Sequence, residues 1–314
     1  MIVVQLKHIS EYALSFSPSL DINQTKPITD FPPLYIHPPK SIHTHTAILL
    51  HGRGSNGPEF AEELFSSLTS KKNNLHDCLP SWRWVFPTAR DRWAVAFEED
   101  ICAWFDAYSL TNIQERQESQ VEGLRESVAH IVGILEAEIT QLNGDTSHVY
   151  LGGISQGMAT ALWTVFCASG TGRIQRQLGG ILGFCGWLPF ADNAEELIRV
   201  HQAKSKSKVQ LQRLVSRFSV ETIGLKPCRE EEASDTFSGF PILTTPVLLG
   251  HGTDDAFVSV ELGQQASRVL KEVLDSGNIE WMGYSGADNE GHWIKEPEAF
   301  DRILAFLAGP SSEE

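Results

Sequence analysis

The sequence of 314 residues lacks the features that would place the chain in a membrane, in an oxidising compartment or on nucleic acid. No apolar run reaches the roughly 18 residues of a transmembrane helix, and residues 1–7 are too short a run for a signal peptide. The five cysteines are odd in number and contain no Cys-x-x-Cys pair, which argues against a disulfide framework or a zinc site. With a net charge of -15 and no dense basic run, the surface is unsuited to a polyanion. We therefore expect a cytoplasmic protein with no stable membrane insertion and no nucleic-acid partner.

Short apolar strands alternate with helices along most of the chain, as is typical of a parallel sheet with crossover helices. The pattern predicts an α/β protein with a mostly parallel sheet and helices on both faces. Because it runs on without a second start, we expect one domain over 46–309, an N-terminal extension at 1–45 that could add an edge strand, and a flexible tail at 310–314. Strands are predicted at 46–50, 82–86, 149–154, 178–184, 246–249 and 279–284, and helices at 58–64, 113–142, 156–166, 260–274 and 297–307.

A polar segment at 191–240 interrupts this alternation just before the strand at 246–249. A helix is possible over 194–218, and 227–239 is typical of a loop. Insertions of this length are either functional lids or connections without regular structure, and the sequence does not distinguish the two.

The stretch Gly153-Ile154-Ser155-Gln156-Gly157 lies between a predicted strand and a predicted helix. In that context the pattern predicts a nucleophile elbow, a turn so tight that small residues must flank the serine. The turn presents the Ser155 hydroxyl at a helix N-terminus, where the backbone N–H of Gln156 could stabilise an oxyanion. An ordinary Gly-rich turn is the less favoured interpretation.

A serine nucleophile needs a base that is oriented by an acid, and in this arrangement the chain order is serine, acid, histidine. Asp254 and Asp255 both follow the strand at 246–249, and the local sequence does not choose between them. His292 lies in a loop after the strand at 279–284 and is the candidate base. His251 precedes the two aspartates, and we expect it to shape their turn.

The loop His51-Gly52-Arg53-Gly54-Ser55 follows the first buried strand. Its glycines allow close backbone approach to a ligand, and the N–H of Arg53 is the candidate second oxyanion donor. A phosphate-binding loop is the less favoured alternative, because no Gly-Lys-Ser/Thr follows. His43 and His45 alternate before the strand as a metal pair might, although an exposed strand end explains such a pattern more often. We expect no metal and no organic cofactor.

Taken together, these motifs resemble the phospholipase/carboxylesterase family, the group of the α/β-hydrolase superfamily that contains the acyl-protein thioesterases. The resemblance covers about residues 46–307. It implies an α/β-hydrolase fold, a triad of Ser155, Asp255 and His292, oxyanion donors at Arg53 and Gln156, and Trp104 on the acyl side of the cleft. The segments that carry it are 50–57 (LHGRGSNG), 86–89 (FPTA), 104–106 (WFD), 152–157 (GGISQG), 251–255 (HGTDD) and 291–292 (GH).

The chain departs from the family pattern in several places. Thr253 stands where the family has its first aspartate, and Arg53 stands where an apolar residue is usual. The N-terminal extension and the insertion are longer than a minimal member needs.

We therefore predict a serine hydrolase that cleaves a carboxylic ester or thioester through an acyl-Ser155 intermediate. The substrate is expected to be a small molecule, a lipid or an acylated protein, and the oligomeric state is not predicted. One alternative is a biosynthetic esterase or thioesterase for a small molecule. Another is a catalytically silent hydrolase fold that binds a ligand, and a weaker one is acyl transfer to an alcohol or amine.

Overall fold

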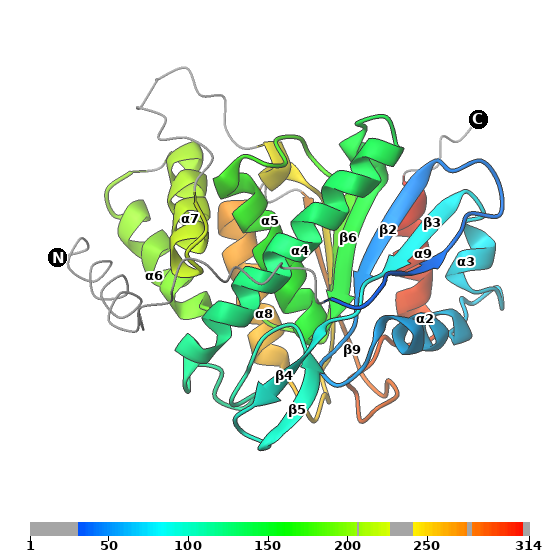
Figure 1. Cartoon of the computed structure of the whole chain (residues 1–314), viewed down its shortest axis with the longest axis horizontal. Coiled ribbons are helices and arrows are strands. Elements are labelled where there is room, and N and C mark those ends of the chain that lie inside the picture. Colours follow the sequence, from blue (N-terminus) through cyan, green and yellow to red (C-terminus); the bar gives the residue numbers. More distant parts are fainter. Residues whose placement is uncertain (1–30, 206, 227–240, 275–277, 310–314) are drawn as a thin grey trace, which may run out of the picture.

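Seven strands form the central sheet, in the order β1-β3-β2-β6-β7-β8-β9 (Figure 1). All neighbouring strands are parallel except β1, which pairs antiparallel with β3 at the edge. The mostly parallel sheet predicted from the sequence is therefore confirmed. The computed structural model describes residues 31–205, 207–226, 241–274 and 278–309. The strands are β1 Tyr35–His37, β2 His45–Leu50, β3 Trp82–Phe86, β6 Val149–Ile154, β7 Gly180–Phe184, β8 Val247–Gly252 and β9 Ile279–Tyr284.

Helices cover both faces of the sheet, as expected (Figure 1). Strand β2 is accordingly buried on both faces. Ile48 and Leu50 belong to one buried cluster, and Ala47 and Leu49 belong to the other. A strand buried on both faces reads as a continuous apolar run rather than an alternating one. One face carries α4 Gln120–Gln141, α5 Gln156–Thr171 and α8 Val260–Val273, and the other carries α2 Gly57–Ser66, α3 Leu75–Cys78 and α9 Glu298–Ala308.

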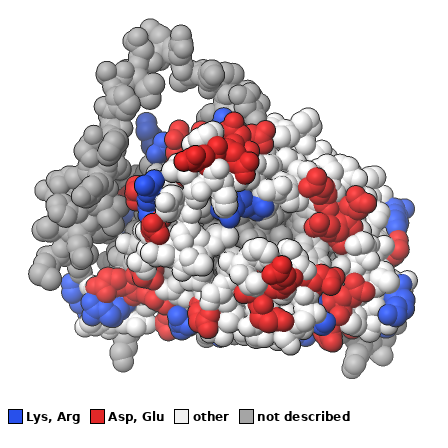
Figure 2. Space-filling view, turned by 90° about the horizontal axis from the view of Figure 1, so that it is seen from below, with Lys and Arg blue, Asp and Glu red and all other residues white. Residues whose placement is uncertain are grey.

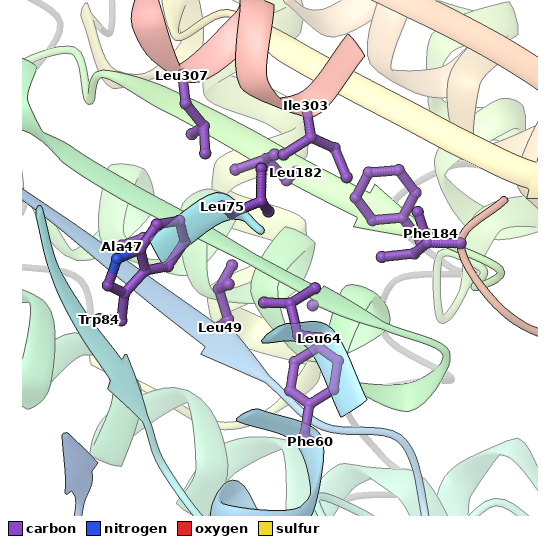
Figure 3. A pocket seen from close by; sticks show the side chains of 12 residues that line it. Ala47, Leu49, Phe60, Leu64, Leu75, Trp84, Leu182, Phe184, Ile303 and Leu307 are labelled. Atoms are coloured by element: carbon purple, nitrogen blue, oxygen red, sulfur yellow. The ribbon is translucent and has the colours of Figure 1, made fainter. Parts of the chain in front are cut away.

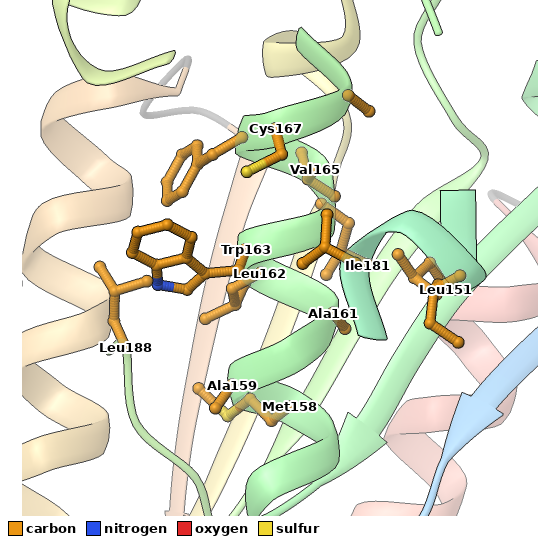
Figure 4. Close-up of a cluster of buried hydrophobic side chains, with 14 of the residues drawn as sticks. Leu151, Met158, Ala159, Ala161, Leu162, Trp163, Val165, Cys167, Ile181 and Leu188 are labelled. Carbon is orange, nitrogen blue, oxygen red and sulfur yellow. The ribbon is translucent and has the colours of Figure 1, made fainter. Parts of the chain in front are cut away.

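Helix α5 is buried on nearly its whole circumference, because the sheet lies on one side of it and other helices cover the rest. Figure 4 shows Leu162, Trp163 and Ile181 in the resulting cluster. Helix α7, Lys208–Thr222, packs so closely that a Cβ atom on Gly170 would lie 2.5 Å from the carbonyl oxygen of Ser216. The start of α5, where Ser155 lies, is therefore held by packing along the helix.

The predicted helices differ in their bounds from the observed ones, and the helix predicted at 156–166 continues to Thr171. The helix predicted at 113–142 begins at Gln120, because Arg116 has a φ of 51° and cannot continue a right-handed helix. The helix possible over 194–218 is two helices, α6 Ala191–Gln202 and α7, and the Ser207 side chain caps the second.

The insertion is thus helical over much of its length. Ile198 of α6 and Val215 of α7 are buried in the same core as α5 and α8. The expected edge strand of the N-terminal extension is β1. Residues 1–30, most of the predicted loop at 227–239 and the tail at 310–314 lie outside the described residues.

The sequence analysis missed an antiparallel hairpin, β4 Arg90–Ala94 and β5 Glu99–Ala103. It lies beyond the ends of β2 and β6 in Figure 1. Its strands are short and charged and carry little apolar alternation. The hairpin is tied to the loop after β2, since the Gly54 N–H donates to the Cys102 carbonyl at 2.8 Å.

Within the described ranges, no helix combines the length and apolarity needed to cross a bilayer. The four cysteines that the structure describes are free thiols, and Cys228 lies outside the described residues.

Candidate active site

Three of the candidate residues follow the carboxyl ends of parallel strands of the sheet. Arg53 follows β2, Ser155 follows β6, and Asp255 follows β8. In an open α/β sheet, ligands bind at this edge. Figure 2 looks at the molecule from the side of these strand ends and shows an uncharged area between groups of acidic side chains.

Ser155 occupies a strained turn between β6 and α5, with φ 55° and ψ -122°. Both flanking glycines are required by space. A Cβ atom would lie 2.1 Å from the Leu50 carbonyl oxygen at Gly157 and 2.6 Å from it at Gly153. The packing reason given for the Gly-x-Ser-x-Gly pattern is therefore confirmed.

Asp255 accepts a hydrogen bond from His292, with Oδ2 2.7 Å from Nδ1. Its side chain has no exposed surface, and Oδ1 accepts the N–H groups of Phe257 and Val258, each at 2.9 Å. Burial alone would raise the pKa of Asp255. Hydrogen bonds from His251, His292 and the Val258 N–H outweigh burial and hold this pKa well below its usual range. The carboxylate is therefore ionised and aimed at His292.

The neighbouring Asp254 has a different role. Asp254 is exposed, and its Oδ2 accepts the N–H of Gly286 at 2.8 Å. This hydrogen bond joins the loops after β8 and β9. Geometry thus separates two carboxylates that the local sequence could not.

The loop after β9 carries His292 across the end of β7. Cys185 directly follows β7, and its thiol contacts the Trp293 carbonyl at 3.5 Å and the Tyr284 hydroxyl at 3.4 Å. Since β7 lies between β6 and β8, this contact holds the loop on the side of the sheet where Ser155 lies. Burial raises the pKa of the Cys185 thiol to about 12, so it packs as a neutral group.

Potential metal ligands gather in one place among the described residues, where Cys185, Asp255 and His292 offer atoms within 4.8 Å of one another. The Asp255–His292 hydrogen bond accounts for this proximity. His43 and His45, which the sequence offered as a metal pair, each have other contacts. His43 is bonded to Thr46, and His45 stacks on Trp82 at 4.7 Å between ring centroids.

His51 organises the loop after β2. Its Nε2 accepts the N–H of Ala89 at 2.9 Å, so Nδ1 carries the proton and donates to the Gly52 carbonyl at 2.6 Å. Burial lowers the pKa of His51 to about 4, which keeps the ring neutral. A Cβ atom on Gly52 would lie 3.4 Å from Cβ of Ser155, so this loop abuts the serine turn.

The side chains of the two candidate oxyanion donors point to one segment. Arg53 donates to the Ala107 carbonyl at 3.1 Å, and its guanidinium lies 4.8 Å from the Phe97 ring. Gln156 donates to the Phe105 carbonyl at 2.7 Å. Both backbones are therefore anchored through residues 104–107.

The prediction that Trp104 lines the cleft is wrong, because Trp104 has no exposed surface. Its indole N–H donates to the His51 carbonyl at 2.9 Å, and its ring belongs to the core. Exposed apolar surface comes instead from Phe257, whose ring stands edge-on to His292 at 5.5 Å, and from Phe97 of the hairpin.

A cavity of about 20 Å³ lies in the core beneath α2 and α9 (Figure 3). Leu49, Leu64, Leu182 and Ile303 are among its apolar lining residues. A space of this size holds about one water molecule. It is a packing void and does not accommodate an acyl chain.

Comparison with known proteins identifies a family and several relatives. The model of the family described as phospholipase/carboxylesterase matches residues 33–210. The chain is 25% identical over 250 residues to acyl-protein thioesterase 1 of Yarrowia lipolytica, covering 79% of this chain and 86% of that protein. It is 27% identical over 256 residues to carboxylesterase SOBER1 of Arabidopsis thaliana, covering 79% and 83%.

Solved structures share the fold. Acyl-protein thioesterase 2 of Zea mays superimposes with a TM-score of 0.57 at 24% identity, covering 88% of this chain and 97% of that one. Esterase PE8 does so with a TM-score of 0.54 at 22% identity, covering 87% and 96%.

Proposed function

This chain belongs to the phospholipase/carboxylesterase family, and we propose that it hydrolyses a carboxylic ester or thioester through an acyl intermediate on Ser155. The names of the family and of the matched relatives describe ester or thioester hydrolysis. The observation that carries the residue assignment is the 2.7 Å hydrogen bond from His292 to the buried Asp255, at the sheet edge that also holds the Ser155 turn.

In the first half-reaction, His292 takes the proton of Ser155 as the hydroxyl oxygen attacks the acyl carbonyl carbon. Asp255 accepts the Nδ1–H of His292, which directs Nε2 toward the serine and stabilises the imidazolium that forms. Collapse of the tetrahedral intermediate expels the alcohol or thiol, which receives the proton from His292. In the second half-reaction His292 activates water, which attacks the acyl-serine and releases the acid.

We assign the oxyanion to the backbone N–H groups of Arg53 and Gln156. Gln156 is the first residue of α5, where the helix dipole and the free amides favour negative charge. The backbone of Gly52 lies close to Ser155, since a Cβ atom added to the glycine would be 3.4 Å from Cβ of Ser155, and this supports placing the Arg53 amide nearby.

We propose an apolar acyl group as the part of the substrate that lies beside His292. Phe257 presents an exposed ring there, and Phe97 presents another beside Arg53. The free thiols support our expectation of a reducing, cytoplasmic location. The complete Asp255–His292 pair favours catalysis over a silent ligand-binding fold.

Labelling with a fluorophosphonate probe tests the assignment. We expect the folded wild type to react at Ser155, Ser155→Ala not to react, and Ser55→Ala, in the neighbouring loop, to react like the wild type. No labelling of the wild type, or equal labelling of Ser155→Ala, would contradict the proposal.

A further inference from the structure

We propose that His251 is a positioning residue for the acid of the triad, whose Nε2–H donates to the same Asp255 oxygen that accepts His292. This inference rests on the proposed function, because it concerns the acid that orients the proposed base. Sequence reasoning gave His251 no more than a part in shaping the turn.

The first observation is the position of the His251 ring. His251 lies near the end of β8, and its Nε2 is 3.2 Å from Oδ2 of Asp255 and 2.9 Å from the carbonyl oxygen of Val258. The side chains of His251 and Asp255 are both fully buried. Since both neighbours of Nε2 are hydrogen-bond acceptors, this nitrogen must carry the proton and share it between them.

The opposite side of the ring explains why this tautomer is held. Nδ1 is buried and has no hydrogen-bond partner within the described part of the chain. It faces Gly263 of α8, where a Cβ atom would lie 2.3 Å from Nδ1 and 3.0 Å from the Trp281 ring. A proton on Nδ1 would find no acceptor there. The absence of a side chain at position 263 is what allows the ring to fit beneath α8.

The consequence is that both oxygens of Asp255 are held from two sides. Oδ1 accepts two backbone amides, from Phe257 and Val258. Oδ2 accepts His292 at 2.7 Å and lies 3.2 Å from Nε2 of His251. Without His251, one of the two donors that hold Oδ2 is lost, and the carboxylate can turn away from the direction that aligns His292. The hydrogen bond from His251 is also the first of those that depress the pKa of Asp255 against the effect of burial.

The alternative is that His251 only fills space between β8 and α8 and does not position Asp255. Two substitutions distinguish these two roles. His251→Gln keeps an N–H near the position of Nε2, whereas His251→Leu fills much of the same volume without a donor. For each variant, kcat and KM for an ester, the rate of fluorophosphonate labelling and the downfield NMR signal of the His292 Nδ1 proton are measured.

We expect His251→Leu to lower kcat and the labelling rate by about 10- to 100-fold, because small misplacements of a catalytic group have effects of this size. KM should change little, since His251 lies behind the carboxylate, and the downfield proton signal should broaden or disappear. His251→Gln should restore most of kcat and the signal.

A second pair of variants leaves His251 itself in place. Gly263→Ala should displace the ring and lower kcat, whereas Gly133→Ala, in α4 with open space around its Cβ position, should leave kcat unchanged. This pair keeps the inference testable if His251→Leu does not fold.

The outcomes are distinguishable from failure of the proposed function. A wild type that is not labelled at Ser155 would overturn both. A labelled wild type with unchanged kcat in His251→Leu, equal loss in the Gln and Leu variants, or unchanged kcat in a folded Gly263→Ala, would overturn the role of His251 alone.

Discussion

The backbone N–H of Trp104 donates to the side-chain oxygen of Gln156 at 2.9 Å. The side-chain nitrogen of Gln156 donates to the carbonyl of Phe105. Because Ala107 in this segment also accepts from Arg53, residues 104–107 connect the two proposed oxyanion donors. The residue after the proposed nucleophile thus combines two features. Its backbone N–H is the proposed oxyanion donor, and its side chain bonds to the segment at 104–107.

Gln156→Ala should therefore destabilise the protein although it retains the backbone N–H. The substitution leaves the buried Trp104 N–H and Phe105 carbonyl without partners, which we expect to lower the free energy of unfolding by about 2–5 kcal/mol. Urea unfolding measures the change. Gln175→Ala is the matched control, because its side chain is exposed and bonds to one carbonyl. Equal stability of the two variants would refute this account.

Asn substitution of each neighbouring aspartate distinguishes their roles. Asp255→Asn should lower kcat by about 10³- to 10⁴-fold, because the amide no longer holds the His292 tautomer and charge. Asp254→Asn retains an oxygen that can accept the Gly286 N–H, so kcat should stay near the wild-type value. Steady-state kinetics on one ester decides between them. A comparable loss in both variants would show that the two carboxylates had not been correctly separated.

Stability should decrease as the pH falls from about 6.5 to 4. Burial lowers the pKa of His51 from 6.5 to about 4, so in this window the unfolded chain binds more protons than the folded protein. The free energy of unfolding is therefore highest above pH 6.5, and the loss attributable to His51 is on the order of 3 kcal/mol. Burial lowers the pKa of His130 to about 4 as well, which adds in the same direction.

Urea unfolding at several pH values measures this loss, and NMR titration of the His51 ring identifies its source. A flat stability profile over this window would contradict the prediction. Protonation of the His51 ring near pH 6.5 in the folded protein would also contradict it.

Phe257→Ala tests the apolar surface beside His292. If the acyl chain contacts this ring, KM for long-chain esters should rise by about 10-fold, as loss of part of a buried aromatic contact implies. KM for short-chain esters should change little. Leu214→Ala removes an exposed apolar side chain on α7 and serves as the control. An unchanged chain-length profile in Phe257→Ala would place the acyl group elsewhere.

Features that are local in the chain could be predicted from the amino-acid pattern. Apolar runs marked the strands of the sheet because a strand buried on both faces has no polar positions to alternate. Gly153 and Gly157 marked the serine turn because no side chain fits against the Leu50 carbonyl. The order of Ser155, an acid at position 254 or 255 and His292 followed from where the predicted strands end, and the resemblance to the family implied Asp255 as the acid.

Features that depend on contacts between distant segments required the folded structure. Asp254 and Asp255 are adjacent in the chain, and the local sequence did not choose between them. The resemblance to the family implied Asp255, and the packing of the loop after β9 places His292 against Asp255. Trp104 was expected in the cleft wall but is buried in the core. The hairpin at 90–103 was not predicted, because its strands are short and charged. His251 reads as one histidine among 11 in the sequence. Its contact with Asp255 exists because the fold places a glycine of α8 behind the ring, and no local pattern records that space.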